Sequence, residues 1–523
     1  MNAPFAEFPD RLLQGATLAD LDELLNRQAS RRAVLRVGGL LGAAALTPAL
    51  WVQSARASST SIYGKHLAYG TDPKTSMLVA FAVTGPFTSA AVRITNSDGV
   101  DFTVPAEVAT VRGSNNRYAR ATVIGLKPDT LYHYAMTLDG TALATSTLRT
   151  APSTAVPFRF TAFGDQGTGI EAREMVRRVG SLRPRLHLLA GDLCYADSSG
   201  GGRPQDVFHP RRWDEWLAVN GPVARSIPWM CAVGNHEMEP GFGPEGYSGV
   251  LARVPIGGTS PLAVPVASVF RVASTAFISL DSNDVSHEIP ANRGWTNGAQ
   301  TAWLESTLAA LRTPGSGVDF IVAYMHHSAY CTNTSHGSEG GIREAWVPLF
   351  DRYTVDLVVS GHNHCYERTR PLRAGAITSH ASDTIDSRLG TTYVTAGGGG
   401  QVATRNFTTN GNTSVSLADG RQVETAPWSV PDRTGEHLVL CVDVTPSSRT
   451  RSASMHLRAL GAAGDVRDQI ALVRGPVPAS SAGLSAQDGW LLGAGGVVAG
   501  GLIGTGAIVL RRRATAPSTS ESS

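Results

Sequence analysis

Residues 186–195 read LHLLAGDLCY, an apolar run of five residues that stops at a glycine and leads at once into Asp192 and Tyr195. An apolar run that ends in Gly or a polar side chain is typical of a buried strand that enters a functional loop. Five segments of the chain share this pattern, and their apolar runs cover residues 158–163, 186–190, 229–233, 320–325 and 355–360. We therefore expect the polar residues after these runs to converge at one edge of a sheet.

The side chains that follow the five runs are of the types that bind metal ions. In chain order they are Asp165, Asp192 with Tyr195, Asn235, His326, and the pair His362 and His364. A carboxylate that bridges two cations, with mixed nitrogen and oxygen ligands, generates a hydroxide near neutral pH and clamps a phosphoryl group. The set therefore predicts a two-metal hydrolytic site. A thiolate site is disfavoured, because the five cysteines (Cys194, Cys231, Cys331, Cys365 and Cys441) show no C-x-x-C spacing.

Two patterns of periodicity divide the chain. Residues 60–150 consist of short alternating runs separated by turn residues, which predicts a small all-β sandwich similar to a fibronectin type III domain. From 156 to 473, strands alternate with helical patterns at residues 169–182, 298–311 and 341–350. This predicts an α/β domain with a two-sheet sandwich, in which strands beyond residue 371 complete the second sheet.

The order of the metal-binding motifs resembles the calcineurin-like metallophosphoesterases and, within them, the purple acid phosphatases. Ordinary members carry a His two residues after the first Asp, where Gly167 stands here, and the missing ligand reappears as Tyr195. The resemblance covers residues 62–460 and implies that Asp165, Tyr195 and His364 bind a ferric ion. It also implies that Asp192 bridges two metals, and that a divalent Zn, Fe or Mn ion is bound by Asn235, His326 and His362.

The resemblance also implies roles for two histidines that are not ligands. His236 matches a residue that contacts the substrate phosphate, and His336 matches one proposed to protonate the leaving alkoxide. His327 is open between substrate contact and packing, whereas His187 lies in an apolar run and is expected in the core. We expect residues 366–368 to support the metal ligands. Gly397 to Gly400 should form a tight turn beside the site.

The implied function is that of an acid phosphatase-type metallophosphoesterase, which hydrolyses phosphate monoesters by attack of a metal-bound hydroxide. A phosphodiesterase or phospholipase acting on nucleotides or lipid head groups is an alternative, because the same two-metal clamp serves both ester types. A surface binding protein with an inert catalytic fold is another. The net charge of +2, without a long basic tract, gives no support for nucleic acid as a partner.

The two ends of the chain predict export and membrane attachment. Residues 30–36 read SRRAVLR and precede an apolar stretch and the site Ala55-Arg56-Ala57, so residues 1–57 resemble a twin-arginine signal peptide. A polar linker at 474–489 leads to an uncharged apolar segment at 490–510 and a basic tail at 511–523, which predicts one membrane helix with the catalytic part outside the cell. An internal anchor at the first segment, a helix without a membrane at the second, and secretion after removal of the anchor are the alternatives. Export would permit disulfides, of which Cys194 to Cys331 is one candidate.

Overall fold

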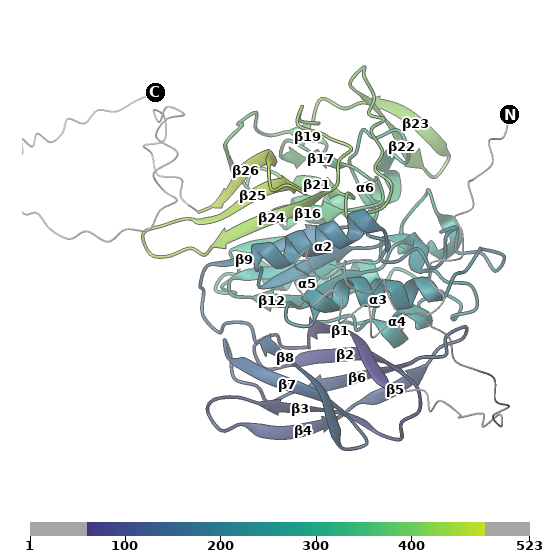
Figure 1. Cartoon of the computed structure of the whole chain (residues 1–523). Coiled ribbons are helices and arrows are strands. Elements are labelled where there is room, and N and C mark those ends of the chain that lie inside the picture. The colour runs from purple at the N-terminus through teal and green to yellow at the C-terminus, as the bar shows by residue number, and fades with distance from the viewer. Residues whose placement is uncertain (1–59, 476–523) are drawn as a thin grey trace, which may run out of the picture. The chain divides into compact units, whose positions relative to one another are not determined.

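The computed structural model describes residues 60–475 (Figure 1). The predicted signal peptide, membrane helix and cytoplasmic tail lie outside the described residues, as does the predicted linker except for residues 474 and 475. Between residues 60 and 475, the helices are all too short or too polar to cross a membrane.

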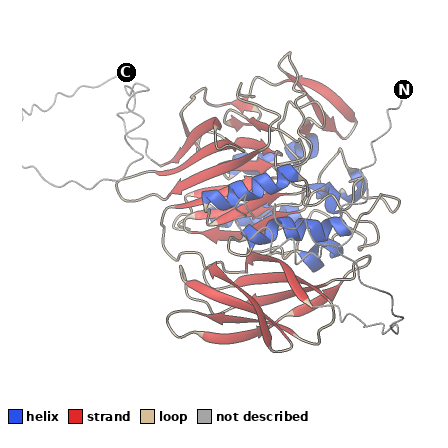
Figure 2. Ribbon diagram, in the orientation of Figure 1, coloured by secondary structure: helices blue, strands red, loops and turns tan. Residues whose placement is uncertain are grey.

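The N-terminal domain is an all-β sandwich of two antiparallel sheets (Figure 2). In the sheet of order β1-β2-β6-β5 the strands span Ser61–Tyr69, Met77–Thr84, Arg117–Val123 and Glu107–Thr110. In the sheet of order β4-β3-β7-β8 they span Asp101–Pro105, Ala90–Thr95, Leu131–Leu138 and Thr141–Arg149. Strand β7 shows why the sheets pack, because Tyr132, Tyr134, Met136 and Leu138 alternate with more exposed neighbours. Because the pattern repeats every two residues, the apolar side chains of β7 lie on one face of its sheet, which packs against the other sheet.

The α/β domain contains a seven-stranded sheet of order β11-β10-β9-β24-β25-β26-β20. Its strands span Trp229–Ala232, Leu186–Ala190, Phe158–Phe163, Leu438–Thr445, Ala453–Gly461, Val466–Arg474 and Thr384–Asp386. Strands β9, β10 and β11 are parallel, whereas β24, β25 and β26 extend this first sheet with antiparallel pairing. They do not complete the second sheet, although the sequence had led us to expect this.

A second sheet of six strands has the order β12-β13-β14-β16-β21-β17. Its strands span Ser268–Val272, Thr275–Ser279, Phe320–Tyr324, Leu357–Ser360, Thr392–Ala396 and Tyr366–Arg368. The four strands from β13 to β21 are parallel, and the two edge strands are antiparallel to their neighbours. Two smaller sheets are formed by β15 (Ser338–Glu339), β22 (Asn412–Leu417) and β23 (Gly420–Thr425), and by β18 (Leu372–Arg373) and β19 (Ala376–Ile377).

The two large sheets face each other across an apolar core. Phe160 on β9 meets Phe277 on β13 edge to face, with ring centroids 5.2 Å apart. The buried runs on these strands carry side chains on both faces, because helices cover the outer faces. The predicted fold class, an α/β two-sheet sandwich preceded by an all-β domain, is therefore confirmed.

Helices pack on the outer face of each large sheet. Helices α2 (Ile170–Leu182) and α3 (Arg211–Ala224) share an apolar cluster with the first sheet, and α5 (Ala299–Leu311) shares one with the second. The helix expected at 341–350 is two short helices instead, α6 (Gly340–Ala345) and α7 (Val347–Arg352). The break falls at Trp346, two residues before Pro348, whose ring removes a backbone donor and is tolerated only in the first turn of a helix, here that of α7. Short helical turns are α4 (Ser248–Arg253), η2 (Asn235–Glu237), η3 (Ser282–Asp284) and η4 (Pro290–Asn292).

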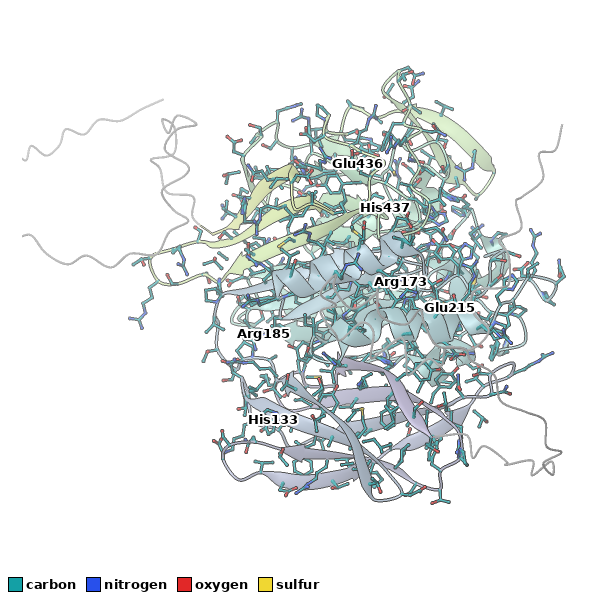
Figure 3. All side chains as sticks on the ribbon, viewed as in Figure 1. His133, Arg173, Arg185, Glu215, Glu436 and His437 are labelled. Atoms are coloured by element: carbon teal, nitrogen blue, oxygen red, sulfur yellow. The ribbon has the colours of Figure 1, made fainter. Side chains whose placement is uncertain are left out.

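Polar contacts join the sandwich to the α/β domain. The hydroxyls of Tyr63 and Tyr118 both donate to the Asp214 carboxylate on α3, at 2.7 and 2.9 Å. Arg185, labelled in Figure 3 just before β10, forms an ion pair with Asp129 of the sandwich at 3.1 Å. The sandwich therefore holds the segments that lead into the strands of the site.

Candidate metal centre

Four of the seven predicted ligands have a left-handed backbone. The φ angles of Asp165, Asp192, Tyr195 and His362 are 59°, 52°, 57° and 68°. Side chains other than glycine rarely adopt this conformation, and such strained residues cluster at functional sites. Three of the bends come two residues after a strand, and the fourth, at Tyr195, comes in the same loop as Asp192, so the chain turns sharply beyond the sheet edge where the ligands lie.

Backbone hydrogen bonds tie the loops of the two sheets into one unit. The amide of Asp165 donates to the carbonyl of Gly191 at 3.1 Å, and the amide of Gly361 donates to the carbonyl of His326 at 2.8 Å. The amide of His362 donates to the Asp165 carboxylate at 2.9 Å, which connects the first sheet to the second. The five strand ends therefore meet at one place, as the pattern of the sequence led us to expect.

One group of ligands surrounds the Tyr195 hydroxyl. The Tyr195 oxygen lies 3.2 Å from Asp165 Oδ1 and 3.1 Å from His364 Nε2. His364 donates from Nδ1 to the carbonyl of Val402 at 2.9 Å, so its Nε2 lone pair faces the other two residues. A phenol oxygen, a carboxylate and an imidazole nitrogen thus converge on one point.

A second group of ligands surrounds His326. Its Nε2 lies 3.1 Å from Asp192 Oδ2 and 3.2 Å from His362 Nδ1, while its Nδ1 donates to the carbonyl of Ala190 at 3.0 Å. Two imidazole nitrogens that face each other at this distance need a proton or a cation between them. Asp165, Asp192 and His326 offer ligand atoms within 4.8 Å of one another, so this group adjoins the Tyr195 group.

Asn235 presents an oxygen that lacks a partner. Its amide nitrogen donates to the carbonyl of Gly200 at 2.9 Å, while its buried Oδ1 accepts no hydrogen bond. A buried polar atom without a partner is costly, and a hard cation is a suitable partner for an amide oxygen. The next residue connects Asn235 to the rest of the site, because the His236 amide donates to Asp192 Oδ1 at 3.1 Å.

The electrostatics of these residues also fit a cation. Burial, and then the negative charges of Asp165 and Asp192, raise the pKa of Tyr195 well above its ordinary value. The phenol therefore stays protonated until a positive charge is bound beside it. Burial and the charge of Asp192 raise the pKa of Glu237 to about 8, and this carboxyl accepts hydrogen bonds from the amides of Asp192 and Gly234 at 2.8 and 2.7 Å. Glu237 therefore connects the loop that carries Asp192 to the loop that carries Asn235.

The two histidines predicted to act on substrate lie at the edge of the centre. The ring of His236 lies 4.3 Å from that of Tyr195 at an angle of 50°, and its Nδ1 donates to the carbonyl of Asp197 at 2.5 Å, which leaves Nε2 at 3.7 Å from Asp192 Oδ2. The ring of His336 lies 4.0 Å from that of His362, and 34% of the His336 side chain is exposed. All nine predicted site residues are therefore brought into one connected cluster.

Sequence reasoning missed Glu288, which offers a ligand atom within 4.8 Å of those of His336 and His362. This residue follows no strand, and no motif in the sequence marks it. Burial would raise the pKa of Glu288, but the hydrogen bond from His336 and the charges of His336 and Arg421 outweigh burial and hold the pKa below its usual value.

Residues 366–368, which were expected to support the metal ligands, make two separate sets of contacts. Glu367 accepts hydrogen bonds from the amide and hydroxyl of Thr332, both at 2.7 Å, and so holds the loop that leads to His336. Tyr366 and Arg368 both donate to Asp468, which is 6% exposed.

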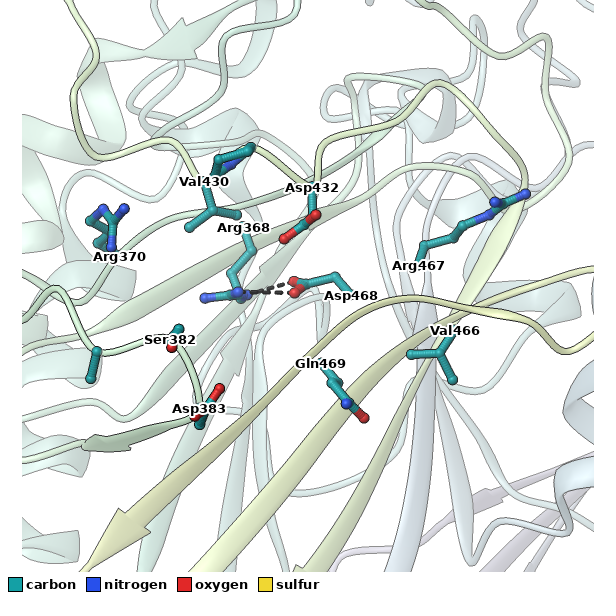
Figure 4. Close-up of a pocket in the computed structure, with 12 residues that line it drawn as sticks. Arg368, Arg370, Ser382, Asp383, Val430, Asp432, Val466, Arg467, Asp468 and Gln469 are labelled. Atoms are coloured by element: carbon teal, nitrogen blue, oxygen red, sulfur yellow. Dashed lines mark hydrogen bonds and ion pairs between the residues drawn. The ribbon is translucent and has the colours of Figure 1, made fainter. Parts of the chain in front are cut away.

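The Arg368–Asp468 pair lines a cavity of about 450 Å³ (Figure 4). Its lining includes no predicted ligand, and its charges balance, with three arginines (368, 370 and 467) against three aspartates (383, 432 and 468). This cavity is therefore separate from the group of predicted ligands.

The glycine run contacts the ligand loops directly. The amides of Gly397 and Gly399 donate to the carbonyls of Cys365 and Gly164, at 2.9 and 3.0 Å. A Cβ at Gly397 would lie 2.8 Å from Asp165 Oδ2, so only glycine allows this close approach.

His187, His327 and the five cysteines are all buried. His187 is buried, accepts or donates one hydrogen bond with Thr161 at 2.9 Å, and packs between the rings of Phe163 and Trp229. His327 is buried and bonds Ser282 at 2.8 Å. All five cysteines are free and buried, and the thiol near Cys331 is that of Cys365, 3.9 Å away, in place of the Cys194 partner considered above.

Comparisons with known proteins agree with this arrangement. Residues 158–366 match the family of calcineurin-like phosphoesterases, and residues 63–153 match the N-terminal domain of purple acid phosphatases. An uncharacterized protein of Mycobacterium tuberculosis is 37% identical over 389 residues, which cover 68% of this chain and 72% of that protein. Purple acid phosphatase 23 of Arabidopsis thaliana is 28% identical over 301 residues, or 53% of this chain and 61% of that protein.

A similar fold is seen in the solved structure of the purple acid phosphatase PPD1 from yellow lupin (Lupinus luteus) seeds. It superposes with a TM-score of 0.64 at 18% identity, over 79% of this chain and 75% of that one.

Proposed function

Because the chain belongs to the purple acid phosphatase family of the calcineurin-like phosphoesterases, we propose that it hydrolyses phosphate monoesters at a dinuclear metal centre. The observation that carries the proposal is the convergence of two adjoining groups of ligand atoms. Asp165, Tyr195 and His364 form one, and Asp192, His326 and His362 form the other. Asn235 adds an oxygen that has no other partner.

We assign the first group to a ferric ion and the second, with Asn235, to a divalent Zn, Fe or Mn ion, with Asp192 shared between them. The donor types support this division, because a phenolate suits a hard trivalent ion and imidazole suits the divalent ions. When bound, the two ions would lower the pKa of a shared water and clamp the phosphoryl group. Burial of the ligands excludes bulk water and strengthens these charges.

The proposed roles of His236 and His336 rest on which of their ring nitrogens is not used in a hydrogen bond. His236 uses Nδ1 to bond the Asp197 carbonyl, so Nε2 is the atom that would contact a phosphate oxygen. His336 uses Nδ1 to bond Glu288 at 2.8 Å, so Nε2 is the atom that would give a proton to the leaving alkoxide.

The metal assignment is tested by replacing Tyr195 with Phe in the full chain. A phenolate bound to ferric iron absorbs visible light, so Tyr195→Phe should lose that band and at least about tenfold of the turnover. Tyr330→Phe is the matched control. Tyr330 is also buried, but its ring packs on those of Tyr393 and Trp428, neither of which is a predicted ligand. A Tyr195→Phe protein that keeps both iron and an unchanged spectrum would refute the ferric assignment.

The substrate class is tested by turnover of aryl phosphate monoesters against bis-aryl diesters. A preference for the monoester supports the proposal. A preference for the diester favours a phosphodiesterase or phospholipase, and fewer than two metal ions per chain with no turnover favours a binding protein with an inert fold.

We further propose that the chain is exported in a folded state and held on the outer face of the membrane, or released if its anchor is removed. The support is the pair Arg31-Arg32 and the uncharged segment at 490–510 that ends in three arginines. Changing Arg31 and Arg32 to Lys should retain the protein in the cytoplasm, as measured by cell fractionation. Unchanged export of this variant would contradict the twin-arginine route.

A further inference from the structure

One carboxylate, that of Glu288, contacts both a proposed proton donor and a proposed metal ligand. Its Oε1 accepts a hydrogen bond from His336 Nδ1 at 2.8 Å, and its Oε2 lies 3.4 Å from His362 Nε2. The side chain is 15% exposed, so solvent competes weakly for these contacts. Each oxygen of the carboxylate thus serves one imidazole.

The backbone of this loop is held by a second carboxylate, that of Glu339. Glu339 accepts hydrogen bonds from the amides of His287 and Glu288, at 2.8 and 3.2 Å, and from the hydroxyl of Ser286 at 2.9 Å. Glu339 is the last residue of β15, three residues after His336. The loop of Glu288 and the loop of His336 are therefore fixed to the same strand.

A guanidinium completes the arrangement from the β22–β23 hairpin. Arg421 Nη2 lies 2.7 Å from Glu288 Oε1, and Arg421 Nη1 donates to the carbonyl of His336. The hairpin pairs with β15 through β22, so its position depends on the segment that carries His336. Arg421 therefore ties the backbone of His336 to the carboxylate that bonds the His336 ring.

These contacts orient both imidazoles. A carboxylate at Nδ1 of His336 directs Nε2 away from Glu288, and a carboxylate at Nε2 of His362 leaves the Nδ1 lone pair facing His326 Nε2 at 3.2 Å. Carboxylates that accept a hydrogen bond from the second nitrogen of a metal-bound His fix its tautomer and ring orientation.

We propose that Glu288 is a positioning residue that orients the proton donor His336 and the metal ligand His362 through one carboxylate, which Arg421 holds in place. This inference rests on the proposed function for the roles of the two histidines. It adds that the Glu288 carboxylate supports both the protonation of the leaving group and the binding of the divalent ion.

A third metal ion bound by Glu288, His336 and His362 is the other way to use these ligand atoms. The position of Arg421 argues against it. A cation at this place would lie beside a guanidinium that already contacts the same carboxylate oxygen at 2.7 Å. Like charges at such a distance repel, so hydrogen bonding accounts better for the cluster.

The test compares Glu288→Gln with Glu344→Gln in the full chain. Glu344 is the matched control, because it also pairs with a histidine of this loop, His287 at 3.0 Å, but its side chain is 56% exposed and touches no predicted site residue. Two quantities are measured for each: turnover of an alkyl and an aryl phosphate, and affinity of the metal-free chain for Zn²⁺ by competition with a chromophoric chelator.

Glu288→Gln should lose about 10- to 100-fold in Zn²⁺ affinity. It should also lose at least about tenfold more turnover with the alkyl phosphate than with the aryl phosphate, because a poor leaving group depends on protonation. Arg421→Gln should shift both quantities in the same direction by less, and Glu344→Gln should shift neither. Arg421→Gln also keeps the inference testable if Glu288→Gln does not fold.

The inference is overturned if Glu288→Gln and Arg421→Gln match the wild type in both quantities, or if the wild type holds a third ion that Glu288→Gln loses. Failure of the proposed function is distinguishable from failure of this inference. A wild type that hydrolyses no phosphate ester refutes the function, whereas the Zn²⁺ affinities still test the contact between Glu288 and His362.

Discussion

Replacing Gly200 should weaken the proposed site of the divalent ion and leave the proposed ferric site intact. Its carbonyl accepts the hydrogen bond from the Asn235 amide at 2.9 Å, and its amide donates to Asp197 at 3.2 Å. The carbonyl of Asp197 in turn holds the ring of His236. This turn therefore orients one proposed ligand of the divalent ion and the proposed phosphate contact.

A methyl group at Gly200 has no room. With φ at 62°, its Cβ would contact the Asn235 amide nitrogen and lie 2.7 Å from the ring of His236. The left-handed backbone alone costs an Ala residue roughly 1–2 kcal/mol. Overpacking adds about 1–3 kcal/mol, so Gly200→Ala should lower the free energy of unfolding by about 2–5 kcal/mol in total.

Gly294→Ala isolates the backbone contribution. Gly294 has a φ of 76° and no atom within 4 Å of its added Cβ, so this variant carries the conformational cost without the collision. It should lose only about 1–2 kcal/mol and keep full activity. The difference between the two variants measures the contact with Asn235 and His236.

The assays are metal content after dialysis, visible absorption and turnover. Gly200→Ala should bind the divalent ion about 10- to 100-fold more weakly and lose turnover by a similar factor, because Asn235 Oδ1 is turned away. The visible band should remain, since the atoms nearest to the added Cβ belong to Asn235 and His236 and not to Asp165, Tyr195 or His364. Two tightly bound ions and unchanged turnover in Gly200→Ala would refute this account of the site.

Two further predictions concern stability. Burial lowers the pKa of His187 to about 3 from 6.5, so the unfolded chain binds a proton in this window that the folded chain does not. Stability is then lost as the pH falls from 6.5 towards 3, by about 1.4 kcal/mol per pH unit, and His187→Phe should flatten this slope in denaturant titrations; an equal slope would contradict it. Asp468→Asn should cost about 3–5 kcal/mol because it leaves the buried Arg368 without its charge partner. Asp386→Asn, which breaks the half-exposed pair with Arg388, should cost at most about 1 kcal/mol in the same thermal or denaturant measurement, and equal losses would refute the difference.

Much of the fold was predictable because its signals are local. The strands that precede Asp165, Asp192 and His326 are continuous apolar runs, as expected where both faces of a sheet are covered. The family prediction is likewise confirmed. The helical stretch expected at 341–350 is present but interrupted at Trp346, because Pro348 is tolerated only in the first turn of a helix and so begins a second one.

The sheet order was not predictable, because it depends on pairing between distant segments. Strand β24 lies antiparallel to β9, with Leu440 opposite Ala162, although nearly 280 residues separate them. No local pattern specifies such a partner. The nine site residues remain predictions of role, but their convergence follows from strand ends that parallel pairing brings to one edge.

Glu288 was not predictable for the same reason. It lies in a loop that follows no strand, and its partners Glu339 and Arg421 come from segments about 50 and 130 residues further along the chain. A lone acidic residue in such a loop is most often solvated, so the sequence offers no reason to select it.

The left-handed ligands explain why these loops are bonded to one another so densely. Four such residues cost the fold roughly 4–8 kcal/mol in total, which is comparable to the whole stability of a domain. The hydrogen bonds between the loops offset part of this cost, since the amides of Asp165, Gly361 and His362 all find partners across the site. The remaining strain would favour any ligand that binds the bent state alone. A cation does so, because the Tyr195 oxygen, the Asp192 carboxylate and the imidazoles converge only when the backbone is bent. Metal binding and the strained conformation therefore stabilise each other, and the strand ends can act as a rigid metal site although each bend is unfavourable by itself.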